Sequence, residues 1–170
     1  MHSDTIESTE ITQYLTFKLA DEIYAINVGH IREVLSVPRI TRVPRMPSYL
    51  SGVINLRGNV IPVLDIREKF GMGKTTITGN TSIIVTEIEE VFVEEADSSM
   101  VIGIFSDEVQ KVIDLDPSLI EGPPRIGSTI DTSFIEGMGK TDEGFVILLR
   151  LDRILSDTEL SGITVEARDA

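Results

Sequence analysis

An internal repeat sets narrow limits on how this chain can fold. Residues 49–70 align without a gap on residues 134–155 at an offset of 85, and residues 25–35 align on residues 103–113 at an offset of 78. Apolar positions coincide in both alignments while charged positions mostly differ, as expected of units that share a core pattern. Any two β hairpins of similar length align tolerably, but two blocks in the same order at nearly equal offsets favour a true repeat. We therefore predict two related five-stranded units of about 60 to 70 residues each, the size of small barrels.

Short strands separated by turns account for most of each unit. Alternating apolar and polar residues predict a hairpin over residues 14–28, and the run SGVINLRGNVIPVL predicts a second over residues 51–64, with its turn at Arg57-Gly58-Asn59. Pro62 lacks a backbone N–H, so its strand is expected at a sheet edge or a bulge. Further strands are expected at residues 34–37, 82–93, 100–105, 108–115, 134–139 and 145–151. This pattern is typical of all-β barrels or sandwiches.

Helices are expected to be few and short. An amphipathic turn is predicted near residues 30–35, a helical turn at residues 65–70 with Asp65 as its N-cap, and a short helix over residues 152–160. Residues 38–47 contain three prolines and are expected to form a loop or an extended edge.

The repeat also predicts a domain organisation. One barrel is expected at about residues 14–70 and the other at about residues 80–151, together forming one domain over residues 14–156. A flexible tail over residues 1–13 and a C-terminal helix end and tail over residues 157–170 complete the chain.

Composition excludes several classes of protein. The 170 residues carry 15 basic and 28 acidic side chains, for a net charge of −13, which argues against general nucleic-acid binding. The absence of Cys excludes a disulfide framework, a thiolate zinc site and a cysteine nucleophile. No apolar run approaches the roughly 20 residues of a membrane span, and the polar N-terminus does not read as a secretory signal. An intracellular globular protein is expected.

The charge is unevenly distributed along the chain. Residues 29–70 hold seven of the 15 basic residues but only three of the 28 acidic ones. This arginine-rich stretch is suited to steering an acidic partner surface toward the protein. The alternative is a solvated face with local ion pairs.

Motifs for catalysis or cofactor binding are weak. GMGKTT over residues 71–76 resembles a phosphate-binding loop, but the position that should be glycine is Glu68, whose carboxylate would repel phosphate. His2 and His30 lack metal-site spacing, and the acidic cluster within residues 87–97 lacks the glycine-centred spacing of a calcium loop. No serine nucleophile elbow is present. The sequence therefore predicts a protein that is not an enzyme and has no metal or cofactor.

The hairpin motif carries a family resemblance. Residues 14–70, with the run GVINLRGNVIPVLDIREKF, resemble the CheW family of bacterial chemotaxis coupling proteins, as do YAINVGHIREVL and VIGIFSDEVQKVIDL. The NLRG…IPV…D pattern is shared with the regulatory domain of the CheA histidine kinase. A chain of this length, without a phosphotransfer or ATPase domain, is similar to the stand-alone adaptor. The resemblance implies a mainly β fold of two SH3-like five-stranded β-barrels packed together, with short helices.

The same resemblance implies a function without catalysis. The protein would couple the cytoplasmic tips of methyl-accepting chemotaxis receptors to CheA, in the cytoplasm at receptor arrays of the inner membrane, with neither nucleic-acid binding nor membrane insertion. Receptor tips are helical hairpins, so recognition would be of the helix-in-groove kind. A groove between the barrels would supply apolar walls, with Ile31, Val34 and Val101 as candidates. Contacts with the related kinase domain would join barrel ends into rings.

Carried over by position, the resemblance implies four further site residues. Arg57 and Glu33 fall where the family has a functionally important Arg and Glu, and we expect them to pair and to order the rim of the groove. Gly52 and Gly103 match family glycines near these contacts, where a side chain would block close approach. A purely structural role for the two glycines is an equal alternative.

The sequence is compatible with two other functions. One is an SH3-like regulatory or nucleotide-binding module acting outside chemotaxis, built on the GMGKTT turn. The other is an RNA-binding β-barrel, which the absence of Trp and the aromatic content of 5% disfavour. The acidic segment 87–99 looks longer than is usual in the family, and its purpose is open.

Overall fold

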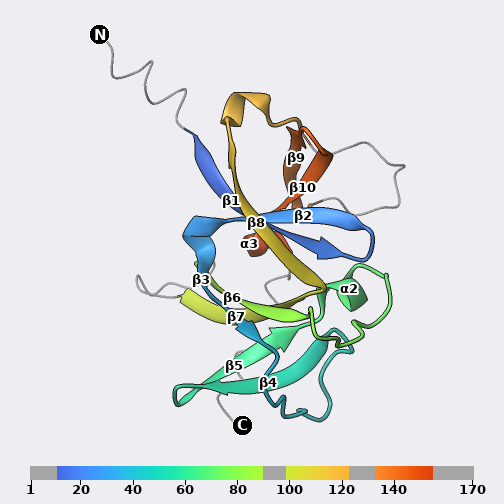
Figure 1. Ribbon diagram of the computed structural model, residues 1–170. Helices are drawn as coiled ribbons and strands as arrows, with labels where there is room; N and C mark the ends of the chain where they lie inside the picture. The colour runs from blue at the N-terminus through green and yellow to red at the C-terminus, as the bar shows by residue number, and fades with distance from the viewer. Residues whose placement is uncertain (1–10, 90–98, 123–132, 155–170) are drawn as a thin grey trace.

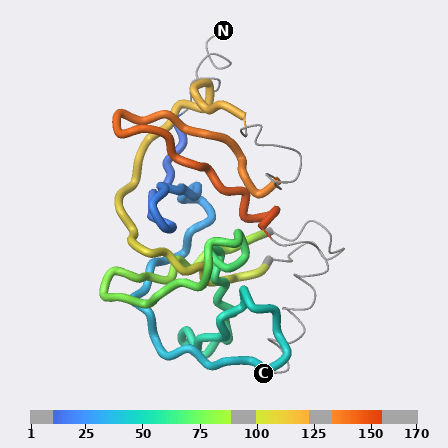
Figure 2. The backbone as a smooth tube through the Cα atoms, turned by 90° about the vertical axis from the view of Figure 1, so that its right-hand side faces the viewer, coloured from blue at the N-terminus to red at the C-terminus, as the bar shows by residue number. Residues whose placement is uncertain are grey.

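The computed structural model describes residues 11–89, 99–122 and 133–154, and within these ranges ten strands form two five-stranded sheets. Figure 1 shows one sheet above the other, and the side view in Figure 2 shows the same two levels. The upper sheet has the strand order β8-β1-β2-β10-β9 and the lower sheet the order β3-β6-β7-β5-β4. The mainly β fold with two five-stranded units is therefore confirmed.

The strands of each sheet come from separated parts of the chain. The upper sheet contains β1 (Thr12–Leu19), β2 (Glu22–Asn27), β8 (Glu108–Leu115), β9 (Ile135–Thr141) and β10 (Gly144–Leu149). The lower sheet contains β3 (Ile31–Ser36), β4 (Leu50–Leu56), β5 (Asn59–Leu64), β6 (Ser82–Glu89) and β7 (Ser99–Ser106). The helical turns are η1 (Val28–His30), α2 (Ile66–Lys69), η2 (Pro117–Leu119) and α3 (Leu151–Ile154).

Each sheet closes into a barrel through one isolated bridge. In the lower sheet Thr41, beyond the end of β3, bridges Val53 of β4, with backbone N–H···O bonds of 2.8 Å in both directions. In the upper sheet Glu121, beyond the end of β8, bridges Met138 of β9 with bonds of 2.9 and 2.8 Å. We refer to the two closed sheets as the upper barrel and the lower barrel.

The two barrels share one pairing pattern, which supports the repeat. Strands β1 to β5 occupy the same places as β6 to β10, and in each barrel one neighbouring pair is parallel, β2 with β10 and β5 with β7. The division into barrels at about residues 14–70 and 80–151 is wrong, however. Strands β1 and β2 pair with the second copy, and β6 and β7 pair with the first. The alignment records the order of strands in each copy and carries no information on which copy they pair with.

Buried side chains form three clusters, one inside each barrel and a larger one between them. Ile83 faces the interior of the lower barrel, while its neighbour Ile84 faces the cluster between the barrels, as the alternation of a strand requires. The cluster between the barrels draws on both, from Phe17 and Ile26 of the upper barrel to Leu64 and Ile104 of the lower. The two barrels are therefore joined through a common core.

Polar and aromatic contacts add to this junction. Asp107, between β7 and β8, accepts hydrogen bonds from Nη1 of Arg67 at 3.0 Å and from the backbone N–H of Ala20 at 2.7 Å. Arg67 lies in α2 beside the lower barrel, and Ala20 lies in the β1–β2 turn of the upper barrel. The rings of Phe70 and Phe134 stack with their centroids 4.1 Å apart. These contacts link the two barrels at the side where α2 lies (Figure 1).

Most local predictions hold, and two need correction. The hairpins, the strand over residues 108–115 and the N-cap at Asp65 are present as expected. The amphipathic turn near residues 30–35 is instead η1 followed by a strand that begins at Ile31, because the β6 ladder extends to Thr86 opposite it. The predicted features at residues 1–10, 90–98, 123–132 and 155–170 lie outside the described residues.

The strand that contains Pro62 is not at a sheet edge, since β5 lies between β4 and β7. The alternative of a bulge fits better, because the β4–β5 register shifts between Leu50 and Gly52, next to the Val53–Pro62 pair. Opposite Pro62, Val53 donates its N–H to Thr41 and not across to β5. The parallel pairing with β7 begins only at Val63. The missing N–H of Pro62 therefore removes no bond from the β4–β5 ladder, so an interior strand can accept a proline here.

Candidate functional site

Arg57, in the β4–β5 turn, and Glu33, on β3, come together on the lower barrel. Nη1 of Arg57 donates to Oε1 of Glu33 at 3.5 Å, and Nη2 of Arg57 donates to Oε2. The two side chains are 70% and 28% exposed, so a partner protein can reach the pair. The pairing predicted from the sequence is confirmed, and its role in binding remains a prediction.

The backbone of the β4–β5 turn explains how Arg57 reaches Glu33. Arg57 and Gly58 have φ values of 52° and 89°, the left-handed pair that suits a two-residue hairpin. The side-chain oxygen of Asn55 accepts from the N–H of Gly58 at 2.9 Å and fixes the turn. Glu33 lies on β3, on the face that also carries Leu35, which packs against the core of the lower barrel. A rigid turn and an anchored strand therefore hold the two charges.

The electrostatics of the pair follow from this geometry. The hydrogen bonds from Arg57, helped by its positive charge, lower the pKa of Glu33 below its usual range. The same carboxylate raises the pKa of Arg57. Both groups are therefore ionised at neutral pH, and the site presents a fixed, bidentate charge pair.

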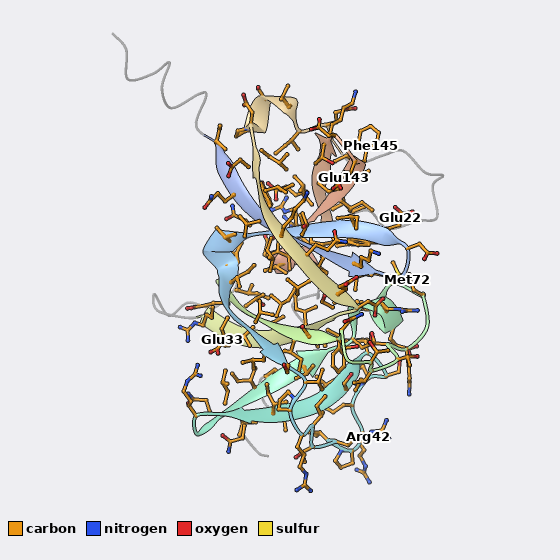
Figure 3. All side chains as sticks on the ribbon, in the orientation of Figure 1. Glu22, Glu33, Arg42, Met72, Glu143 and Phe145 are labelled. Carbon is orange, nitrogen blue, oxygen red and sulfur yellow. The ribbon has the colours of Figure 1, made fainter. Side chains whose placement is uncertain are left out.

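Exposed apolar residues follow both members of the charged pair closely along the chain. Val34, next to Glu33 on β3, is 42% exposed, and Val60, on β5 just after the turn, is 44% exposed. A second ion pair lies on the same strand, where Nε and Nη2 of Arg32 are both 2.8 Å from Oε1 of Glu87. We define the rim surface as Arg57, Glu33, Val34, Val60, Arg32 and Glu87. Figure 3 shows Glu33 on the flank of the molecule beside β3.

Sequence reasoning did not select Val60, Arg32 or Glu87. Val60 could have been found, because it alternates with the inward Ile61 in the strand that follows the turn. The pairing of Arg32 with Glu87 joins residues 55 positions apart, and only the β3–β6 ladder brings them together.

The apolar candidates do not line one common wall. Ile31 packs against the cluster between the barrels, whereas Val101 packs against the core of the lower barrel. Of the three apolar candidates, Val34 is the exposed one. The structure therefore does not gather the proposed groove residues. Alternation along β7 turns Val101 to the interior of the lower barrel. On β3, a register shift separates Ile31 from Glu33, and Val34 lies on the exposed face.

The two glycines are interior positions. A Cβ on Gly52 would lie 2.3 Å from the carbonyl oxygen of Thr41, at the bridge that closes the lower barrel. A Cβ on Gly103, in the middle of β7, would lie 2.7 Å from the side chain of Ile83. Both glycines therefore allow close packing, as the structural alternative predicts, and they do not contribute exposed contact atoms.

The GMGKTT turn is folded around a carboxylate. Asp65 is buried and accepts from the N–H and hydroxyl of Thr75, both at 2.8 Å. The negative charge stands where the backbone of a phosphate-binding loop would present N–H groups to a nucleotide. This geometry disfavours a nucleotide site at the turn.

Two further findings concern metals and membranes. Within residues 11–89, 99–122 and 133–154, His, Asp and Glu side chains form no group of three or more that could hold a metal ion. In the same part of the chain, no helix is long and apolar enough to cross a bilayer.

The fold and the rim surface together define a class of protein. Two fused barrels carry a preorganised, exposed ion pair with exposed apolar neighbours, which is the composition of a protein-docking surface. This arrangement is that of a binding scaffold.

Comparison with known proteins identifies the scaffold more closely. The family model described as a CheW-like domain matches residues 13–159. The chain is 30% identical to a chemotaxis protein CheW of Klebsiella aerogenes, covering 88% of this chain and 84% of that protein. It is 31% identical to a chemotaxis protein CheW of Helicobacter pylori with the same coverage. The crystal structure of a CheW scaffolding protein from Thermoanaerobacter tengcongensis superposes with a TM-score of 0.74 at 34% identity, covering 88% of this chain and 91% of that one.

The chain belongs to the CheW family. It is a non-catalytic scaffolding protein, as the sequence predicted.

Proposed function

We propose that this protein couples the cytoplasmic tips of methyl-accepting chemotaxis receptors to the CheA histidine kinase. It would act in the cytoplasm, at receptor arrays on the inner membrane. The observation that carries the proposal is the Arg57–Glu33 pair, in which the two residues assigned by family resemblance meet at one exposed place.

The rim surface supplies the physical basis for such coupling. A helical partner needs apolar contact and a polar group that sets its orientation. Val34 and Val60 offer apolar contact, and the Arg57–Glu33 pair offers the polar group. Because a turn and a strand already fix the pair, binding would cost little side-chain ordering.

Co-sedimentation with CheA and receptor signalling fragments tests this proposal. Arg57→Glu places two like charges together, so we expect its affinity in the ternary complex to fall about tenfold, as for loss of an interface hot spot. Arg150→Glu is a matched control, because Arg150 is an exposed arginine paired with Asp152 at the end of β10. Wild-type protein that binds neither partner would contradict the proposal, as would an Arg57→Glu variant that assembles normally.

A charge swap separates two ways in which the pair could act. In Arg57→Glu/Glu33→Arg the ion pair is rebuilt with reversed polarity. If the pair only orders the rim, assembly returns in the double variant. If Arg57 itself touches a partner carboxylate, the double variant stays as weak as Arg57→Glu, and a charge reversal on the partner restores binding.

A further inference from the structure

A second exposed surface lies on the lower barrel, formed by the loop between β3 and β4 and the loop after α2. A pocket of about 450 Å³ opens there, and its walls include Arg42, Arg45, Lys74, Pro44, Met46 and Leu50. The three cationic side chains belong to exposed residues. Among the described residues, none of the three has an ion-pair partner, unlike Arg32, Arg57 and Arg67.

The backbone around this basic pocket is held in place. Thr41 is fixed by its bridge to Val53, and the N–H of Leu50 donates to the carbonyl of Pro47 at 3.0 Å. The N–H of Asp65 donates to the carbonyl of Tyr49 at 2.7 Å, and Asp65 in turn holds Thr75, next to Lys74. Asp65 therefore holds both loops that form the pocket, one through its backbone N–H and the other through its carboxylate.

One residue in the pocket is strained. Arg45 has φ 63°, a left-handed conformation that residues with a Cβ rarely adopt. Such strain persists only where the surroundings enforce it, and it is concentrated at binding sites. Here it fixes the backbone from which Arg45 lines the pocket.

The charge of the whole chain narrows the choice of ligand. Residues 29–70 and Lys74 hold eight of the 15 basic residues, while 25 of the 28 acidic residues lie outside residues 29–70. A strongly anionic protein is repelled by extended polyanions such as nucleic acid or an anionic bilayer. A short protein segment with a few carboxylates can reach the pocket without the extended negative charge of a polyanion, so it meets less repulsion.

We propose that the pocket lined by Arg42, Arg45 and Lys74 docks an acidic segment of a partner protein. Carboxylates of the segment would take the fork-shaped donors of the two arginines, and its apolar side chains would cover Met46 and Leu50. This surface is distinct from the rim surface: Figure 3 shows Arg42 at the far end of the lower barrel from the junction, away from Glu33. The inference does not rest on the proposed function.

Fluorescence anisotropy of the full chain with a labelled peptide of alternating Glu and Leu tests the proposal. A peptide with Gln in place of Glu is the matched probe. We expect saturable binding of the Glu peptide that weakens between about 50 and 300 mM NaCl, because exposed charges are screened. In Arg42→Gln/Arg45→Asn, affinity should fall about tenfold, since two charge-assisted contacts are lost. Asn is chosen at position 45 because it tolerates the left-handed conformation.

Two further variants keep the test decisive. Lys74→Gln removes a charge from the other loop and should also weaken binding, whereas Lys140→Gln, on β9 of the upper barrel, should not. The proposal would be overturned if the Glu peptide showed no saturable binding, or if the Gln peptide bound equally well. It would also be overturned if Lys140→Gln lost as much affinity for the Glu peptide as Lys74→Gln. It would also be overturned if inorganic phosphate or phosphatidylglycerol vesicles displaced the Glu peptide at lower concentration than unlabelled Glu peptide does.

Discussion

At the scale of single residues, the rim surface depends on an arginine in an unfavourable place. The first position of a two-residue turn with positive φ is usually Asn, Asp or Gly, yet here it is Arg57 with φ 52°. The matching turn of the second copy, Asp142-Glu143, carries no arginine. The strained turn thus holds Arg57 where its guanidinium pairs with Glu33.

The titration of Glu33 should report the pair directly. Its pKa in the folded protein lies below the ordinary value of 4.5, so the ion pair stabilises the fold above that pH and is lost as pH falls through the lowered pKa. In Arg57→Asn we expect the pKa of Glu33 to rise toward its ordinary value. An NMR titration of the Glu33 carboxyl carbon measures both values. If the two proteins titrated alike, the ion pair would not exist in solution.

At the scale of elements, the barrels close through matching glycines. Gly52 and Gly137 are related by the repeat offset of 85, and a Cβ at each would lie 2.3 and 2.5 Å from the carbonyl oxygens of Thr41 and Glu121. Those carbonyls belong to the bridges that close the two barrels. Each glycine thus lets the chain beyond an edge strand approach the opposite edge.

Alanine at these two positions should open the barrels. For Gly52→Ala and Gly137→Ala we expect the free energy of unfolding to fall by about 2 kcal/mol or more, because backbone atoms cannot yield to the added methyl group. Gly79→Ala is the control, since a Cβ there meets nothing within 4 Å. Urea denaturation measures the free energy of unfolding of all three variants. Variants at position 52 or 137 that matched the control would show that the closing bridges are dispensable.

At the scale of the whole molecule, exchange of strands between the copies makes the two barrels one folding unit. Strands β1 and β2 complete the barrel of the second copy, and β6 and β7 complete that of the first. The large cluster between the barrels takes residues from both halves of the chain, such as Phe17 and Ile104. Neither half can bury its apolar surface alone in this arrangement.

Cutting the chain tests this reciprocal exchange. The turn at Gly79 and Asn80 is exposed and precedes β6, so cleavage there removes no strand. We expect fragments 1–80 and 81–170 to show poorly dispersed amide NMR spectra separately and a native-like spectrum when mixed. A well-dispersed spectrum from fragment 1–80 alone would mean that its five strands form a barrel of their own.

Local patterns in the sequence predicted the repeat, the hairpins and the capped helical turn at Asp65, and the family resemblance pointed to Arg57 and Glu33 as a pair. These depend on local alternation, turn chemistry and motif, which a linear pattern records. Three further features depend on tertiary contacts: the copy that each strand joins, the interior place of Gly103, and the association of Arg42 and Arg45 with Lys74. These features arise where segments distant in the sequence pair with one another. Such pairing depends on burial and on closure of the barrels, and no local periodic pattern in the sequence records it.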